Sequence, residues 1–116
     1  MEWKNDQPIY LQVIELFKKG IILGEFKPKE KIPSVREYAQ QLGINPNTVV
    51  KVYDMLTNEG LIEAQSTNGY YITENLEILN RLKPDFASMY CKGFISQMQG
   101  IGYTIKEAIE LLKEEE

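Results

Sequence analysis

The sequence predicts a mainly α-helical chain with one small β-hairpin. Apolar residues recur at helical spacing along most of the 116 residues. Two capped helix starts lie close together with a glycine between them, and an Asn-Gly pair separates two short β-rich segments farther along. The length suits one small domain, or one domain with a short appendage.

Capping residues and glycines delimit the first two predicted helices. From Pro8 to about Gly24, apolar residues follow the helical period: Ile9, Val13, Leu16, Phe17 and Ile21. An extended segment over residues 26–28 follows, because proline disfavours helix in the residue before it. The second helix begins after Ser34, whose hydroxyl caps it while Glu37, three residues on, reaches back.

The third predicted helix follows almost at once. Gly43 ends the second helix in a left-handed conformation. Asn45 is a good N-cap, and Pro46 takes the first helical position, where its missing N–H costs nothing. The helix extends to about Glu59, before Gly60. Two helices joined by so short a turn form a helix-turn-helix.

Helical spacing separates an inner from an outer face. The inner residues are Val35, Tyr38, Ala39 and Leu42 in the second helix, and Val49, Val52, Tyr53 and Leu56 in the third. The third helix presents Asn47, Val50, Lys51, Asp54 and Asn58 outward. Asparagine pairs with adenine, lysine reaches guanine or phosphate, and valine contacts a thymine methyl. Asp54 would instead repel phosphate. The alternative is an ordinary solvated face.

A hairpin and a helical tail complete the chain. Residues 61–64 and 70–73 are predicted strands, and Asn68-Gly69 between them tolerates positive φ. A helix-turn-helix followed by a hairpin is a winged helix, which we assign to residues 1–74. Residues 75–116 are predicted to be helical, with a cap at Asn75, a kink or break near Pro84 and a last helix from Thr104 capped by Glu107.

Two further features point to nucleic acid. Arg36 lies just inside the second helix, where the Ser34 hydroxyl and the positive helix N-terminus suit a phosphate. The alternative for Arg36 is a surface ion pair with Glu37 or Glu30. The hairpin tip, residues 66–69, is small, polar and uncharged, and suits either a DNA backbone or minor groove, or a simple turn.

Composition excludes several classes of protein. Cys91 is the sole cysteine and histidine is absent, so we expect no disulfide, no metal site and a reducing cytoplasm. No apolar run is long enough for a bilayer, and we expect no membrane association. The net charge of −4 argues against nucleic acid, but its distribution does not. Residues 27–51 carry +3, from Lys27, Lys29, Lys31, Arg36 and Lys51 against Glu30 and Glu37.

Taken together, these residues resemble the DNA-binding domain of GntR-family bacterial transcription regulators. The similarity covers roughly residues 8–73. The matching residues are Pro8, Tyr10, Gln12, Pro33, Ser34, Arg36, Ala39, Leu42, Gly43, Asn47, Thr48, Val49, Tyr53, Leu56, Glu59, Gly60, Gly69, Tyr70 and Ile72. The chain departs from the pattern in two places, at Pro46 and in the wing. Pro46 stands where many relatives have arginine, and Ser66-Thr67 replaces a more basic wing, which implies weaker binding or a different operator.

The short tail is similar to that of the YtrA-type subfamily. That resemblance implies a small helical dimerisation unit with little room for a ligand pocket. A short helical hairpin buries little by itself, so its apolar residues need a partner surface. The residues expected at the dimer interface are Phe86, Tyr90, Phe94, Met98, Ile105, Ile109 and Leu112.

The resemblance implies a homodimeric, cytoplasmic transcription regulator, with repression at an inverted-repeat operator as the expected action and no cofactor. The expected DNA contacts are Ser34, Arg36, Asn45, Asn47, Thr48, Val50, Lys51, Thr67, Asn68, Gly69 and Tyr70. A winged helix that binds protein instead of DNA is the alternative. An enzyme is rejected: some similar domains precede a pyridoxal-phosphate aminotransferase, and we expect this chain to be too short for one. The sequence does not identify an effector.

Overall fold

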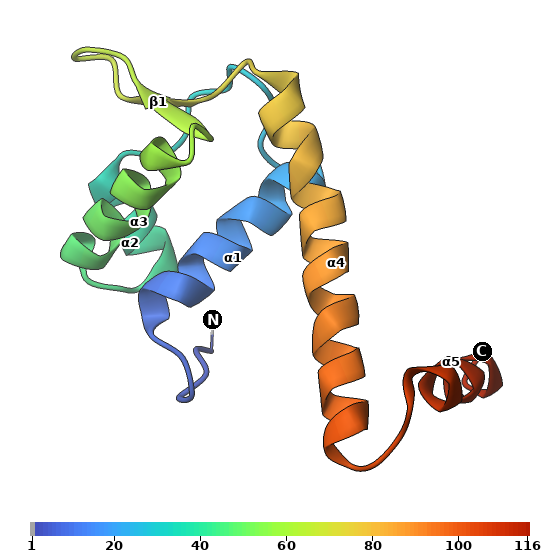
Figure 1. Ribbon diagram of the computed structural model, residues 1–116. Coiled ribbons are helices and arrows are strands. Elements are labelled where there is room, and N and C mark those ends of the chain that lie inside the picture. The colour runs from blue at the N-terminus through green and yellow to red at the C-terminus, as the bar shows by residue number, and fades with distance from the viewer. Residues whose placement is uncertain (1) are drawn as a thin grey trace. The chain divides into compact units, whose positions relative to one another are not determined.

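The computed structural model describes residues 2–116, which form two compact units. The first unit ends at Leu82, and the second covers Lys83–Glu116. The elements in order are α1 (Ile9–Ile22), α2 (Val35–Leu42), α3 (Pro46–Asn58), β1 (Ile62–Ala64), β2 (Tyr70–Ile72), α4 (Leu76–Gly100) and α5 (Ile105–Glu114) (Figure 1). This is the predicted mainly helical chain with one hairpin. No helix among the described residues has the length and apolarity needed to cross a membrane.

An aromatic cluster occupies the core of the first unit. Phe17 of α1 stacks on Phe26 at 4.6 Å between ring centroids, and its ring edge meets Tyr38 of α2 at 6.1 Å. Tyr53 of α3 stacks on Tyr38 at 6.0 Å and meets Tyr70 of β2 edge-on at 4.9 Å. One set of rings therefore joins α1, α2, α3 and the hairpin, and such pairs add to the free energy of simple burial.

The helix-turn-helix forms as the capping residues predict. Gly43 has a φ of 66°, and the Ile44 amide donates to the Ala39 carbonyl at 3.0 Å, which closes α2. The inner residues of α3, Val49, Val52, Tyr53 and Leu56, are all fully buried. The helical period therefore placed the inner face of α3 correctly.

A third segment of chain pairs with the two-stranded hairpin. β1 and β2 pair antiparallel, with Ile62 opposite Ile72. On the other edge of β2, the segment before α2 pairs as well: the Ile32 amide donates to the Tyr70 carbonyl at 3.0 Å, and the Ile72 amide donates to the Glu30 carbonyl at 2.9 Å. The sequence did not predict that this segment would pair with β2. The pairing fixes the start of α2 to the hairpin.

The turn of the hairpin differs from the prediction at Asn68-Gly69. Positive φ occurs at Gly69 (106°) and at Ser66 (51°), and not at Asn68. The amides of Gln65 and Asn68 donate to the carbonyls of Gly69 and Gln65, both at 2.8 Å. The loop covers residues 65–69, the length that the predicted strand bounds imply, but Asn68 does not take the positive φ that it tolerates. A loop of this length leaves the uncharged tip longer and more exposed than a tight turn would.

α4 is a single helix of 25 residues that contains Pro84. Of the predicted kink or break near Pro84, the break is absent, because the helix continues through the proline. An interior proline removes one backbone hydrogen bond and crowds the preceding turn, so contacts on both sides of it must maintain α4. On the N-terminal side Leu79 and Leu82 are buried in the first core, and on the C-terminal side the Phe86 and Tyr90 rings lie 5.8 Å apart. The first compact unit therefore continues past residue 74, into α4.

The second unit has almost no core of its own. From Lys83 onward, the one buried side chain among the described residues is Ala108. α5 is nevertheless well formed at its start. Thr104 and Glu107 make the predicted capping box, with hydrogen bonds of 2.9 and 3.1 Å.

Candidate nucleic-acid interface

The start of α3 carries the polar residues with the clearest binding chemistry. The Asn45 side chain accepts a hydrogen bond from the Asn47 amide at 2.8 Å, so Asn45 serves as the helix cap. The Asn47 side chain is exposed, and no hydrogen bond engages it within the described residues. Its amide group is therefore free for a base edge. Thr48, next along the helix, is partly buried.

The remaining outer residues of α3 lie in solvent. Val50 is 44% exposed, and Lys51, Asp54 and Asn58 are exposed as well. This confirms the outer face that the helical spacing predicted. Asp54 makes no ion pair among the described residues, so its negative charge faces outward uncompensated.

Lys51 does not simply extend from α3. Its Nζ lies 3.7 Å from the centroid of the Tyr10 ring, in a cation–π contact with α1. Sequence reasoning gave Tyr10 no role beyond its match to the family pattern. No local pattern could have found this contact, because the two residues belong to different helices.

The start of α2 is already occupied by a carboxylate. The Ser34 amide donates to Glu37 at 2.9 Å, and the Glu37 amide donates to the Ser34 hydroxyl at 3.2 Å. Hydrogen bonding of the Glu37 carboxylate, first to the Ser34 amide and then to the Ser34 side chain, holds the pKa of Glu37 below its usual value. The carboxylate is thus charged at the helix N-terminus, where it opposes a phosphate.

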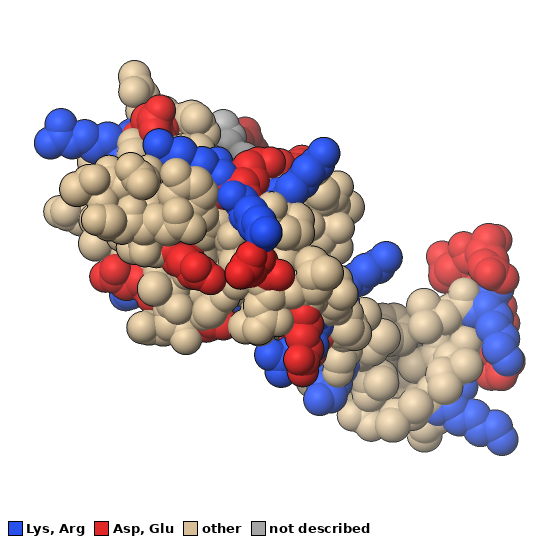
Figure 2. Space-filling model, turned by 90° about the horizontal axis from the view of Figure 1, so that it is seen from above, with Lys and Arg blue, Asp and Glu red and all other residues tan. Residues whose placement is uncertain are grey.

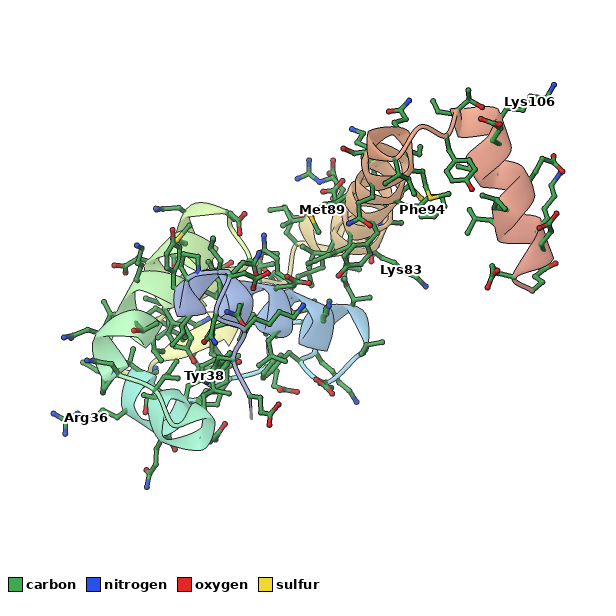
Figure 3. The ribbon with its side chains drawn as sticks, turned by 90° about the horizontal axis from the view of Figure 1, so that it is seen from below. Arg36, Tyr38, Lys83, Met89, Phe94 and Lys106 are labelled. Carbon is green, nitrogen blue, oxygen red and sulfur yellow. The ribbon has the colours of Figure 1, made fainter. Side chains whose placement is uncertain are left out.

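Arg36 projects away from the body of the first unit (Figure 3). It makes no ion pair within residues 2–116, so neither expected partner, Glu37 or Glu30, engages it. An extended, unpaired guanidinium beside the start of α2 is available for a phosphate oxygen.

Other cations near the interface are partly neutralised. Lys29 pairs with Glu74 at 3.2 Å, whereas Lys27 and Lys31 make no ion pair in the described part of the chain. The face in Figure 2 shows basic and acidic side chains interspersed, without a continuous basic patch over the first unit. Attraction to DNA therefore depends on a few unpaired cations.

The wing contributes an exposed polar tip. Thr67 and Asn68 are exposed, while Gly69 is partly buried, and a Cβ on Gly69 would lie 3.3 Å from the Lys31 side chain. Tyr70 turns its ring toward Tyr53 and is partly buried. The wing positions named from the sequence therefore divide into an exposed tip and a tyrosine whose ring belongs to the core cluster.

Gln12 organises the segment before α1. Its side chain accepts from the Lys4 amide at 2.9 Å and donates to the carbonyls of Lys4 and Gln7, at 2.8 and 2.9 Å. This amide holds the N-terminal segment against the helix that carries Tyr10. In the sequence, Gln12 stands out as a polar residue between Leu11 and Val13, but the sequence does not indicate its hydrogen-bond partners.

The apolar residues of the second unit remain open. Tyr90, Ile105, Ile109 and Leu112 are 49, 46, 49 and 49% exposed, and Phe86, Phe94 and Met98 are partly buried. Figure 3 shows Met89 and Phe94 on α4, and Met89 is 51% exposed. No cluster of three or more His, Cys, Asp or Glu side chains in residues 2–116 is placed to hold a metal ion.

Comparison with known families fits this arrangement. The model for bacterial regulatory proteins of the gntR family matches residues 9–72. The chain belongs to the GntR family. It is 34% identical over 112 residues to the transcriptional regulator YhcF of Bacillus subtilis, a match that covers 97% of this chain and 93% of YhcF. It is 46% identical over 72 residues to the repressor YtrA of the same organism, over 62% of this chain and 55% of YtrA.

Solved structures of GntR proteins have the same fold. A GntR regulator from Listeria monocytogenes superposes with a TM-score of 0.88 at 29% identity, over 97% of this chain and 98% of that one. The DNA-binding domain of AraR, solved in complex with an operator, superposes with a TM-score of 0.55 at 31% identity, over 58% of this chain and 81% of that one. This GntR protein is a DNA-binding transcription regulator and not an enzyme.

The carboxylate at the start of α2 gives a testable prediction. Glu37→Gln keeps an acceptor for the capping box but removes a negative charge at the start of α2, where a phosphate is expected. We expect operator affinity at low salt to rise about two- to threefold, the effect of one charge about 8 Å from a phosphate in water. Fluorescence anisotropy measures the affinity, and urea unfolding should give a slightly lower midpoint, because the charged carboxylate that the cap favours is lost. Unchanged or weaker binding would show that Glu37 lies away from the phosphates.

Proposed function

We propose that this GntR regulator is a cytoplasmic homodimeric repressor that binds an inverted-repeat operator. The observation that carries the proposal is the exposed start of α3, where the Asn47 side chain is free and Val50 stands beside it. A helix-turn-helix inserts this end of its second helix into the major groove. An asparagine amide and a valine methyl there distinguish adenine and thymine from other bases.

Different residues recognise the bases and the sugar-phosphate backbone of the DNA. Asn47 and Val50 read base edges, while Arg36 and the Ser34 hydroxyl contact phosphates beside the groove. Asn45 caps the start of α3, and Thr48 lies in the first turn of that helix. The exposed wing tip approaches the flanking DNA, through Thr67, Asn68 and Gly69, with Tyr70 at its base.

Weak attraction per protomer favours a dimer. Glu37 and Asp54 are negative, Pro46 replaces a familial arginine, and the wing tip has no charge. Each of these reduces the affinity of one protomer for a polyanion. Two linked protomers recover affinity because the second half-site binds at a high effective concentration. A two-fold dimer on an inverted repeat satisfies this requirement.

The second unit supplies the surface for that dimer. Its single buried side chain, Ala108, cannot stabilise two helices in water. Ile105, Ile109 and Leu112 lie on one side of α5 by helical spacing, and each is close to half exposed. With Phe86, Tyr90, Phe94 and Met98 of α4, they form the apolar set that a second copy would cover.

Repression follows from occupancy. A dimer bound across a promoter blocks access for the polymerase without any further domain. The similarity to YtrA, a protein named as a repressor, supports this direction of control. A protein-binding winged helix remains the second candidate, favoured by the net charge of −4 and the uncharged wing.

Operator binding tests the proposal. Purified protein is titrated against DNA from upstream of its own gene and against a scrambled sequence, at several salt concentrations, by fluorescence anisotropy. Asn47→Ala should reduce the preference for operator over scrambled DNA by about 1–3 kcal/mol. Arg36→Ala should weaken both complexes alike and lower the salt slope by about one. Asn58→Ala, at the far end of α3, is the matched control and should change neither.

A wild-type protein without preference for any upstream sequence at low salt would contradict operator recognition. The second candidate, a protein-binding winged helix, would then stand. Equal losses from Asn47→Ala on operator and scrambled DNA would remove Asn47 from base reading while leaving DNA binding in place.

The dimer surface gives a separate prediction. Ile109→Glu places a charge in the apolar set, which costs far more free energy when a partner covers this half-exposed position. We expect the dimer dissociation constant to rise about tenfold or more. Lys106→Glu, in the first turn of the same helix, is the control. Sedimentation equilibrium measures both, and a wild-type monomer at all concentrations, or an Ile109→Glu dimer as tight as wild type, would contradict this interface.

A further inference from the structure

The contact between Tyr10 and Lys51 joins the recognition helix to α1. The Lys51 Nζ lies 3.7 Å from the ring centroid, within the distance at which an ammonium is attracted to an aromatic face. Lys51 makes no ion pair among the described residues, so the ring is the partner that orients its charge.

The ring is held in place by its own helix. Tyr10 is partly buried and packs against the core, and Val13 and Ile14, three and four residues on, are buried beneath the same face of α1. Gln12 fixes the adjoining N-terminal segment through its three hydrogen bonds. The ring is therefore a prearranged platform, and the flexible partner is the lysine.

We infer that Tyr10 positions Lys51 to bind a DNA phosphate at the edge of the groove instead of a base within it. This inference rests on the proposed function. An ammonium on a ring face keeps its outward N–H donors free for a phosphate oxygen, so both contacts exist together. Reaching a guanine deep in the groove would require leaving the ring. Asn47 and Val50 are nearer the end of α3 that enters the groove.

The positioning has a consequence for specificity. A lysine on phosphate adds affinity and salt dependence for any sequence, whereas a lysine on guanine adds discrimination. Lys51 then belongs with Arg36 as a backbone contact. Tyr10 acts through Lys51 and is a positioning residue from outside the helix-turn-helix.

The experiment combines four variants with two DNA sequences. Lys51→Met, Tyr10→Leu, Tyr10→Phe and the double variant Tyr10→Leu/Lys51→Met are titrated against operator and scrambled DNA at several salt concentrations. Lys51→Met should weaken both complexes by the same factor and lower the salt slope by about 0.9. Tyr10→Leu should weaken both about two- to fivefold, and Tyr10→Phe, which keeps the ring face, should bind nearly as wild type. In the double variant, the Tyr10→Leu change should add nothing.

Two outcomes would overturn the inference. A loss of discrimination between operator and scrambled DNA in Lys51→Met would make Lys51 a base reader. A full Tyr10→Leu effect in the Lys51→Met background would make Tyr10 independent of it. Circular dichroism checks the fold of Tyr10→Leu. If that variant unfolds, the ring-induced NMR shift of Lys51 in wild type and Tyr10→Phe still tests the pair.

A measurement without DNA separates this inference from the proposed function. The ring should shift the Lys51 Hε protons upfield in the NMR spectrum of the full chain, and the shift should persist in Tyr10→Phe and vanish in Tyr10→Leu. Wild-type protein that shows this shift but binds no DNA would refute the proposed function and the phosphate contact, leaving only the Tyr10–Lys51 pair. Protein that binds operator without the shift would refute the positioning by Tyr10 alone.

Discussion

The Tyr53 side chain connects the elements that form the candidate interface. Its ring lies among Phe17, Tyr38 and Tyr70, and its hydroxyl donates to the Pro33 carbonyl at 2.7 Å. A buried hydroxyl without a partner is costly, so this hydrogen bond fixes the backbone immediately before the Ser34 cap. Burial, with the neighbouring rings Tyr38 and Tyr70, raises the pKa of Tyr53, which keeps the phenol a donor. The starts of α2 and α3 are thereby held in one arrangement.

Charge is the second constraint on this protein. A chain with a net charge of −4 binds a polyanion only if its cations are free where they are needed. Arg36 is free and extended, and Lys51 is oriented by a neutral ring instead of a carboxylate. Glu37 stabilises α2 at the same place where it repels phosphate. In the proposed complex, helix capping and DNA affinity therefore compete at the start of α2, and the proposed dimer would offset the loss.

Local chemistry made much of the fold predictable. Caps at Ser34, Asn45 and Thr104 and the turn at Gly43 depend on neighbours within a few residues, and the helical period assigns the buried faces. The pairing of residues 29–32 with β2 was not predictable in this way. It joins segments about forty residues apart, and its lysines and glutamate show no strand period.

In the candidate site too, the features set by local spacing were predictable and those set by tertiary packing were not. Sequence spacing placed Asn47, Val50 and Lys51 on the outer face, and the structure confirms their exposure. The contact of Lys51 with Tyr10 and the lack of an ion pair at Arg36 depend on tertiary packing. The expected break at Pro84 failed for a related reason, since buried residues before the proline and paired rings after it maintain α4.

Mapping bound DNA on the 116-residue protein by NMR would test this picture most directly. Amide shifts are recorded while operator DNA is added to ¹⁵N-labelled wild type. We expect the largest changes at residues 34–36, 45–51 and 66–69, with Tyr10 following Lys51 and small changes over residues 105–112. Changes confined to Lys83–Glu116, or absent from the start of α3, would contradict recognition of DNA by the helix-turn-helix.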